Sequence, residues 1–398
     1  MTSHVARMRL HWSKPWRVLM TAIHRKPRLE PGEPEPTLRY GDTFGNYVIN
    51  GFAGKGATSY VYEARPRDTF SKVAVKVLHP HLLADPSKRR KFYREARIMM
   101  RMRHQNVVRF HEILEIDGHL AYVMEYIEGV TLEEWMKSQA EHADQMELAC
   151  LFTDILRGLT HAHRHGVVHR DMKPANVLIT PHSGRYVAKI IDFGLARFAD
   201  QPLSQEERAK IAGTAAYISP EEVTDPDSVG LSSDIYSLGV MLYEAACGKR
   251  PFDGATPREL LEAHAHAEPV RPREVNPAIS PEFEEVIMRT LSKRPETRFD
   301  SAPEMIQALE MAIQKAMRAE MEKVALENAA TTEWSRAMMD PTKHGNSPAG
   351  RNNAMMLYLM MCMRALFTVI ASTGATHDES DAHYLSRAHD ADLNLPMC

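Results

Sequence analysis

Two short runs of residues constrain this chain more than any other feature: His169-Arg170-Asp171-Met172-Lys173-Pro174-Ala175-Asn176 and Asp192-Phe193-Gly194. The first run places an acid, an ammonium group and a carboxamide on one short loop, and the second run adds another acid. These groups are needed to handle a hydroxyl nucleophile beside Mg²⁺ and a nucleoside triphosphate. The first hypothesis is therefore a phosphoryl-transfer site.

The composition is typical of a folded protein of a reducing compartment. The 398 residues, 44% hydrophobic and 25% charged, are enough to bury a large core and to form more than one lobe or domain. The net charge of -3 gives no general attraction to nucleic acid, so no nucleic-acid partner is expected. The four cysteines lack the spacing of a zinc site or a disulfide framework, which favours the cytoplasm. His161, His163 and His165 do not share a helical face, so we interpret them as solvated or packing residues.

The order of the predicted elements indicates two lobes. Short runs rich in β-branched and aromatic residues predict strands, and Phe92, Ala96 and Met99 at helical spacing predict a helix between them. The predicted strands include residues 47–49, 60–62, 72–77 and 121–124. The pattern then becomes mainly helical. A small β-rich lobe, about 45–128, is therefore expected to meet a larger helical lobe, about 129–313, at a cleft.

The sequence also provides candidate residues for this cleft. Gly54-Lys55-Gly56 lies between two predicted strands, where a backbone without side chains can approach phosphates closely. Lys76 ends the strand pattern Val73-Ala74-Val75-Lys76, and Glu95 lies on the next predicted helix, where an acid can hold that ammonium group on the phosphates of a nucleotide. The alternative is an unrelated strand lysine and a surface glutamate.

Together these motifs resemble a eukaryotic-like, bacterial-type Ser/Thr protein kinase over residues 45–313, about two thirds of the chain. The resemblance implies a two-lobed α+β protein kinase fold, with a small β-rich N-lobe and a larger helical C-lobe. It also implies transfer of the ATP γ-phosphoryl group to Ser or Thr hydroxyls of protein substrates, with Mg²⁺ as the metal. The alternatives are a kinase-like scaffold that binds nucleotide with little catalysis and recruits partners through its termini, and a small-molecule kinase of the same broad fold.

The resemblance implies a role for each motif residue. Asp171 orients the substrate hydroxyl and accepts its proton, Lys173 neutralises the transferred phosphate, and Asn176 and Asp192 hold Mg²⁺. The residues implied to bind the nucleotide are Ala53, Gly54, Gly56, Val61, Ala74, Lys76, Glu95, Glu125, Ile127 and Leu178.

The adenine site within this set is implied in the same way. Glu125 and Ile127, just after the gatekeeper position, offer backbone groups to the base. Val61, Ala74 and Leu178 enclose its ring.

The segment 213–221 looks like the end of a kinase activation segment, with Ser219 where the family usually has Ala. By the same resemblance, Glu221 is expected to pair with Arg298. Asp234 is expected to fix the catalytic loop from a buried helix. In the family this segment forms the platform for a peptide substrate, which disfavours a small-molecule kinase.

Two departures from the family pattern concern the loops. Ser59 replaces the third glycine of the Gly-rich loop, which stiffens the loop tip. Between residues 195 and 212, Ser204 is the only hydroxyl residue. In one interpretation a phosphate on Ser204 reaches Arg170. In the other, which we favour, the loop is ordered without phosphate and Thr214 faces the catalytic residues.

The two ends of the chain lie outside the kinase-like region. Residues 1–44 form a basic arm and a Pro-rich linker, for which an anionic membrane surface, a targeting role and no partner are the alternatives. Residues 314–398 comprise a helical extension, a linker and an apolar, then acidic, tail. Within them, 355–375 is long enough to cross a membrane, but Arg364 favours a helix that packs on the kinase or a partner. The expected location is cytoplasmic, with membrane association through 355–375 as the alternative.

Overall fold

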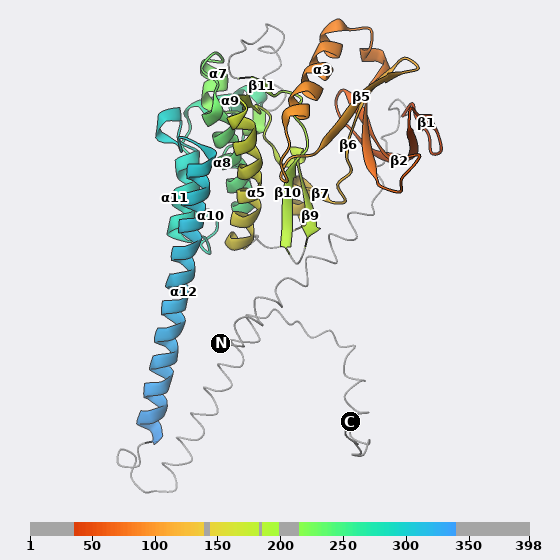
Figure 1. Ribbon diagram of the computed structural model, residues 1–398. Coiled ribbons are helices and arrows are strands. Elements are labelled where there is room, and N and C mark those ends of the chain that lie inside the picture. The colour runs from red at the N-terminus through yellow and green to blue at the C-terminus, as the bar shows by residue number, and fades with distance from the viewer. Residues whose placement is uncertain (1–35, 139–143, 183–184, 199–214, 340–398) are drawn as a thin grey trace, which may run out of the picture. The chain divides into compact units, whose positions relative to one another are not determined.

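The computed structural model describes residues 36–138, 144–182, 185–198 and 215–339, and they form two lobes (Figure 1). The small lobe contains β1 (Thr43–Phe44), β2 (Tyr47–Lys55), β3 (Ser59–Pro66), β4 (Val73–Leu78), the 3-10 turn η1 (Pro80–Leu82), α3 (Pro86–Arg101), β5 (Phe110–Ile116) and β6 (His119–Glu125). The large lobe contains β7 (Val130–Thr131), α4 (Leu132–Ser138), α5 (Gln145–Arg164), β8 (Val167–Val168), η2 (Pro174–Asn176), β9 (Val177–His182), β10 (Arg185–Ile190), β11 (Arg197–Phe198), α7 (Pro220–Thr224), α8 (Leu231–Cys247), α9 (Pro257–His266), α10 (Pro272–Val275), α11 (Pro281–Thr290), η4 (Pro295–Thr297) and α12 (Ala302–Met339). Apart from the far end of α12, these elements belong to one compact unit, Met1–Arg318.

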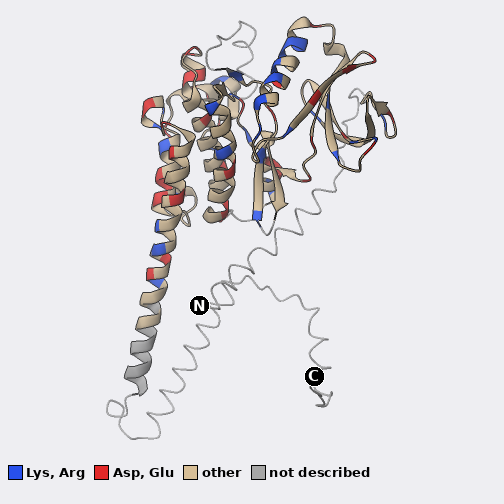
Figure 2. Ribbon diagram, in the orientation of Figure 1, with Lys and Arg blue, Asp and Glu red and all other residues tan. Residues whose placement is uncertain are grey.

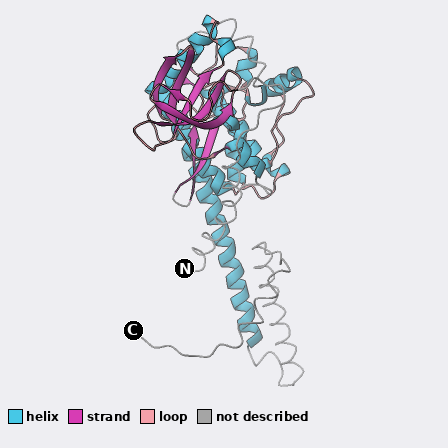
Figure 3. Ribbon diagram, turned by 90° about the vertical axis from the view of Figure 1, so that its right-hand side faces the viewer, coloured by secondary structure: helices cyan, strands magenta, loops and turns pink. Residues whose placement is uncertain are grey.

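An antiparallel sheet of six strands forms the small lobe, in the order β1-β2-β3-β4-β6-β5. Side chains along β4 and β6 alternate between the two faces of this sheet. Val75 and Val123 pack on one face with residues of β2 and β3, whereas Ala74 and Tyr122 belong to the core that contains Phe92 of α3. Figure 3 shows the strands of this sheet gathered in one lobe. The prediction of a small β-rich lobe is confirmed.

Helix α3 begins where the sequence provides a cap. Asp85 accepts hydrogen bonds from two backbone N–H groups of the first turn, and a proline takes the first helical position. The predicted inward residues Phe92, Ala96 and Met99 are buried. Seven of the sixteen residues of α3 are Lys or Arg (Figure 2), and its only acid, Glu95, is buried as well. The one carboxylate of this basic helix is therefore turned into the lobe.

The large lobe is built around α8, which is buried along nearly its whole length. The prediction of a mainly helical lobe is incomplete, because two small sheets, β10-β9-β7 and β11-β8, lie within it. Their strands have two to six residues each, which is too short for a clear period of two in the sequence. The loop that carries Asp171 lies between β8 and β9, and the loop that carries Asp192 lies between β10 and β11. The two sheets therefore fix both ends of each loop.

Helix α12 packs its first part into the core of the large lobe. Met305, Leu309 and Ile313 are buried, at the spacing of one helical face. The helix continues without interruption to Met339, past residue 313, where the sequence pattern predicts the end of the lobe. Within the described ranges, no helix is long and apolar enough to cross a membrane.

Several expectations concern residues outside the described ranges. They include the basic arm, the activation-segment residues Ser204 and Thr214, and the apolar segment 355–375. These expectations stay predictions.

Candidate active site

Strand pairing brings the nucleotide-binding candidates of the small lobe onto one face of the sheet. Lys76 on β4 lies opposite Val61 on β3 and opposite Tyr122 on β6. Ala74, two residues before Lys76, lies on the same face and opposite Met124. This face therefore carries the ammonium group, two of the apolar candidates for adenine and a tyrosine that no motif indicates.

Three charged groups meet around Lys76. Its Nζ lies 2.7 Å from Oε1 of Glu95 and 3.5 Å from Oδ1 of Asp192. The hydroxyl of Tyr122 donates to the same Oε1 of Glu95 at 2.6 Å. Burial lowers the pKa of Lys76, but the two carboxylates more than offset this effect and raise that pKa well above its ordinary value. Lys76 is therefore a cation held between an acid of the small lobe and an acid of the large lobe.

The loop between β8 and β9 orients its polar side chains through short contacts. Nζ of Lys173 lies 3.0 and 2.8 Å from the two carboxylate oxygens of Asp171. The amide nitrogen of Asn176 donates to the backbone carbonyl of Asp171 at 2.7 Å and to its Oδ2 at 3.0 Å. The carboxylate of Asp171 is thus held from two sides. The amide oxygen of Asn176 is the atom that this residue can offer to a metal ion.

Asp234, in the first turn of α8, fixes the backbone of this loop, as predicted. Its carboxylate accepts hydrogen bonds from the backbone N–H groups of His169 and Arg170, at 2.9 and 2.8 Å, and Nε2 of His163 lies 2.8 Å from it. Burial raises the pKa of Asp234, but the interactions with His163 and His169 outweigh burial and hold that pKa below its usual range. Arg170 has a φ of 64°, a strained conformation for a non-glycine residue that these bonds maintain.

Asp192 follows β10 and is held in a tight turn. Its Oδ1 accepts a hydrogen bond from the backbone N–H of Gly194 at 2.8 Å, and Phe193 between them is fully buried. Burial raises the pKa of Asp192, but Lys76 and the Gly194 N–H outweigh it, so the pKa lies below its ordinary value and the group is ionised at neutral pH. A carboxylate and an amide oxygen are hard donors of the kind that Mg²⁺ binds. Asp192 and Asn176 therefore fit a divalent-metal site.

The Gly-rich turn joins β2 to β3. Ala53 and Gly54 lie within β2, so this strand runs further than predicted, and Gly56 begins the turn. A Cβ on Gly54 would meet no atom within 4 Å, one on Gly56 would make only ordinary contacts, and neither residue has a positive φ. The fold itself does not require glycine at these two positions. The glycines instead leave the backbone open to close approach, which suits phosphate groups.

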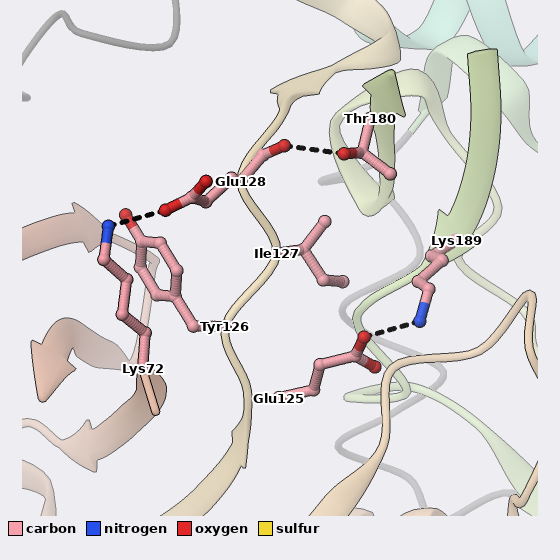
Figure 4. A pocket seen from close by; sticks show the side chains of 7 residues that line it. All are labelled: Lys72, Glu125, Tyr126, Ile127, Glu128, Thr180 and Lys189. Carbon is pink, nitrogen blue, oxygen red and sulfur yellow. Dashed lines mark hydrogen bonds and ion pairs between the residues drawn. The ribbon is translucent and has the colours of Figure 1, made fainter. Parts of the chain in front are cut away.

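The segment after β6 connects the two lobes. The side chains of Glu125 and Ile127 line an open hollow beside this segment (Figure 4). The hydroxyl of Thr180 on β9 donates to the backbone carbonyl of Glu128 at 2.7 Å. Leu178, two residues before Thr180, is half-buried on the same strand. The adenine candidate of the large lobe therefore lies on the strand that contacts the connecting segment.

Comparison with known proteins identifies the family. A model of the protein kinase domain matches residues 47–310. The chain belongs to the protein kinase family. The serine/threonine-protein kinase PknB of Mycolicibacterium smegmatis is 36% identical over 264 residues, which cover 65% of this chain and 41% of that protein. The serine/threonine-protein kinase Pkn1 of Myxococcus xanthus is 30% identical over 322 residues, which cover 81% of this chain and 46% of that protein.

The kinase spans less than half the length of these two relatives. Its structure is similar to the crystal structure of the Mycobacterium tuberculosis PknI kinase domain, with a TM-score of 0.54 and 27% sequence identity. The similarity covers 69% of this chain and 100% of that domain. The bacterial-type Ser/Thr kinase resemblance and the two-lobed kinase fold are thus confirmed.

The kinase has a second buried ion pair next to α7. Arg298 donates to both carboxylate oxygens of Glu221, at 2.8 Å each, and this confirms the predicted pair. The backbone N–H and the hydroxyl of Ser219 both donate to Oε2 of Glu222, at 3.2 and 3.1 Å, in a capping-box arrangement that accounts for serine at this position. Oε1 of Glu222 also lies 3.8 Å from Nε of Arg170. A carboxylate of α7 therefore faces the guanidinium group of the catalytic loop.

Tyr122 and Glu222 are residues of the kinase site that the motifs do not reveal. Tyr122 precedes Met124 by two residues, so strand alternation would have placed both on one face. Its position opposite Lys76 depends on strand register, which the sequence does not state. For Glu222, the only signal is its spacing of three residues from a helix-capping serine.

Proposed function

We propose that this chain is a serine/threonine protein kinase that transfers the γ-phosphoryl group of ATP to Ser or Thr hydroxyls of protein substrates, with Mg²⁺ as the metal. The position of Lys76 carries the proposal, because its ammonium group contacts Glu95 of the small lobe at 2.7 Å and Asp192 of the large lobe at 3.5 Å. Phosphoryl transfer by protein kinases requires this lysine–glutamate pair and the metal-binding aspartate to be in place together. The names of the relatives support the same activity.

The proposed reaction begins at Asp171. Its carboxylate, oriented by Lys173 and Asn176, accepts the proton of a substrate hydroxyl as the hydroxyl oxygen attacks the γ-phosphorus. The bond from the γ-phosphorus to the bridging oxygen breaks as the new bond forms, and ADP leaves with that oxygen. Lys173, whose Nζ lies 2.8 Å from Asp171, is assigned to neutralise charge on the transferred group. Mg²⁺, when bound by Asp192 and Asn176, supplies positive charge to the phosphates.

The remaining candidates form the proposed nucleotide site. Lys76 and the open backbone of residues 53–56 are assigned to the phosphates, and Glu95 holds Lys76 in place. The residues assigned to adenine are Val61, Ala74, Glu125, Ile127 and Leu178. The sheet face shared by Val61, Ala74 and Lys76 supports this division, because one nucleotide can contact all three.

Transfer of labelled γ-phosphate from ATP to a generic protein substrate tests the proposal. The wild-type chain is expected to label Ser and Thr, and Asp171→Ala is expected to reduce labelling on the order of 10²–10⁴-fold. Equal labelling by the two proteins would contradict the assignment. A wild-type chain that binds ATP without transfer would favour the scaffold alternative.

A cytoplasmic location is the corresponding proposal, with contact to a membrane surface as the alternative. The basic arm and the apolar segment 355–375 are the candidate contacts in that alternative. Co-sedimentation with anionic vesicles tests it, with chains that lack either segment as the comparison. No loss of binding in either shortened chain would contradict it.

A further inference from the structure

His79 is a buried imidazole that the proposed chemistry does not use. It follows the last residue of β4 and is only 3% exposed, whereas Pro80 and His81 beside it are exposed. Its ring packs on the ring of Tyr60, with 4.2 Å between the centroids. Packing alone would account for a buried aromatic ring at this position. The polar contacts of the ring point to a further role.

The residue binds the turn of the Gly-rich loop in two places. Nε2 of His79 lies 3.1 Å from the backbone carbonyl oxygen of Gly56, and the backbone N–H of His79 donates to the carbonyl of Thr58 at 2.9 Å. The backbone N–H of Gly56 in turn donates to the carbonyl of Ser59 at 2.8 Å. The turn 56–59 is therefore closed on itself, and His79 attaches it to the end of β4 beside the pairing of Ser59 with Leu78.

The contact with Gly56 also fixes the form of the imidazole. A carbonyl oxygen only accepts hydrogen bonds, so Nε2 of His79 must carry the proton. Burial lowers the pKa of His79, which favours the neutral ring with a single N–H. That N–H is the one directed at the loop.

The open backbone at Gly54 and Gly56 makes the position of this turn important. Local sterics do not require glycine at either position. A glycine also has no side chain that could pack and hold the backbone in place. A loop without side chains has many accessible conformations, and holding it in one of them reduces the entropy lost when a ligand binds. The contacts of His79 act together with the Gly56–Ser59 hydrogen bond to restrict this loop.

We propose that His79 is a positioning residue for the nucleotide: its imidazole holds the Gly56 carbonyl and so keeps the turn 56–59 in the conformation that receives the phosphates of a nucleoside triphosphate. The inference rests on the proposed function. It adds a residue outside the kinase motifs to the phosphate site. It also accounts for a buried polar side chain at the end of β4.

Calorimetric titration with a non-hydrolysable ATP analogue and Mg²⁺ tests this inference without requiring turnover. His79→Phe keeps a ring against Tyr60 but loses the donor, and it is expected to weaken binding about 3–10-fold. His79→Gln places an amide N–H near the position of Nε2 and is expected to bind within about 2-fold of wild type. His111→Phe, the same substitution at an exposed histidine of β5, is the matched control and should bind like wild type.

Steady-state kinetics should distinguish His79→Phe from wild type in the same way. KM for ATP is expected to rise in His79→Phe by the same factor as the dissociation constant, with kcat at saturating ATP within about 2-fold of wild type. Unchanged affinity in His79→Phe would overturn the inference, because ring packing alone would then suffice. Equal weakening in His79→Phe and His79→Gln would also overturn it, because an N–H donor would then fail to restore binding. A wild-type chain that does not bind the analogue contradicts the proposed function itself, and the inference falls with it.

Discussion

Two buried cation–carboxylate pairs, one in each lobe, differ in the partners that surround the cation. In the large lobe, Arg298 binds Glu221 through two hydrogen bonds of 2.8 Å and also donates to the backbone carbonyls of Ser232, Ser292 and Lys293. Among the described residues, Glu221 is the only carboxylate within ion-pair distance of Arg298. All of these contacts join fixed parts of one lobe.

The cation of the small lobe has two acids. Lys76 contacts Glu95 on α3 at 2.7 Å and Asp192 on a loop of the large lobe at 3.5 Å. Glu95 itself accepts a second hydrogen bond from Tyr122. If one carboxylate is removed or moves away, Lys76 therefore keeps the other as its counter-charge.

This difference suggests that one pair serves the stability of the fold and the other serves activity. Opening the Arg298 pair leaves a buried charge without a counter-charge, which is costly. Opening the Lys76 pair leaves Lys76 with Asp192 as its counter-charge and leaves Glu95 with the Tyr122 hydroxyl. The pair of the large lobe is therefore suited to hold the fold, and the pair of the small lobe is suited to form and break as the nucleotide site changes.

The largest expected effect is on the pair of the large lobe. Glu221→Ala should lower the free energy of unfolding by about 3–5 kcal/mol, because Arg298 stays buried without its counter-charge. Chemical denaturation measures this loss. Glu296→Ala, which removes the acid of an exposed pair with Arg294, is the control and should leave stability unchanged within error. A Glu221→Ala protein as stable as this control would show that the carbonyl contacts of Arg298 suffice.

The next effect is on activity and not on the fold. Glu95→Gln should lower kcat/KM about 10–100-fold, because a neutral amide holds Lys76 on the phosphates less firmly. Its thermal midpoint should stay close to that of wild type, since Asp192 remains beside Lys76. Glu115→Gln is the control. It removes the exposed partner of Arg89, which lies on α3 together with Glu95. Unchanged kinetics in Glu95→Gln would mean that another acid holds Lys76.

Glu222 sharpens the comparison, because it adjoins Glu221 but its pKa is shifted in the opposite direction. Burial raises the pKa of both; Arg298 outweighs burial for Glu221, but burial prevails for Glu222, whose pKa is about 7. A carboxyl whose pKa is higher in the folded chain stabilises it fully below the ordinary value of 4.5, and this contribution is lost as the pH rises to about 7.

Glu222→Gln, which imitates the protonated form, should therefore gain stability relative to wild type as the pH rises. The gain between pH 5 and pH 7.5 is expected to be roughly 1–3 kcal/mol. Denaturation of both proteins at the two pH values measures it. A stability difference that does not change with pH would show that Glu222 is already ionised at pH 5.

The smallest effect concerns the second partner of Glu95. Tyr122→Phe removes one hydroxyl and keeps the ring, so kcat/KM should fall only about 2–5-fold. Tyr93→Phe, the same change on α3 at an exposed hydrogen bond to Glu115, is the control. A loss as large as that of Glu95→Gln would mean that the Tyr122 hydroxyl, more than Lys76, sets the position of Glu95.

Much of this arrangement could be predicted, because motif order and spacing carry it. The strands at 47–49, 60–62 and 72–77 lie where the β-branched runs predict them. The contacts of Asp234 with the catalytic loop, and of Glu221 with Arg298, also follow from the family pattern. In each case the residue type and its place in a motif are enough to state the contact.

The remainder depends on distances that no local pattern encodes. The two sheets of the large lobe consist of strands too short to show a period. The contact of Tyr122 with Glu95 needs the register of β4 against β6 and the position of α3. The approach of Glu222 to Arg170 depends on a left-handed backbone at Arg170 that its sequence does not favour.

The central claim is that Asp171 serves the transfer step, whereas Asp192 binds the metal. A comparison of variants of these two residues tests it most directly. Mg·ATP affinity and phosphate transfer are measured on Asp171→Asn and Asp192→Asn side by side. Asp171→Asn is expected to keep wild-type Mg·ATP affinity and to lose turnover on the order of 10²–10⁴-fold, whereas Asp192→Asn is expected to lose metal-dependent nucleotide binding as well. Equal loss of nucleotide affinity in both variants would contradict the account.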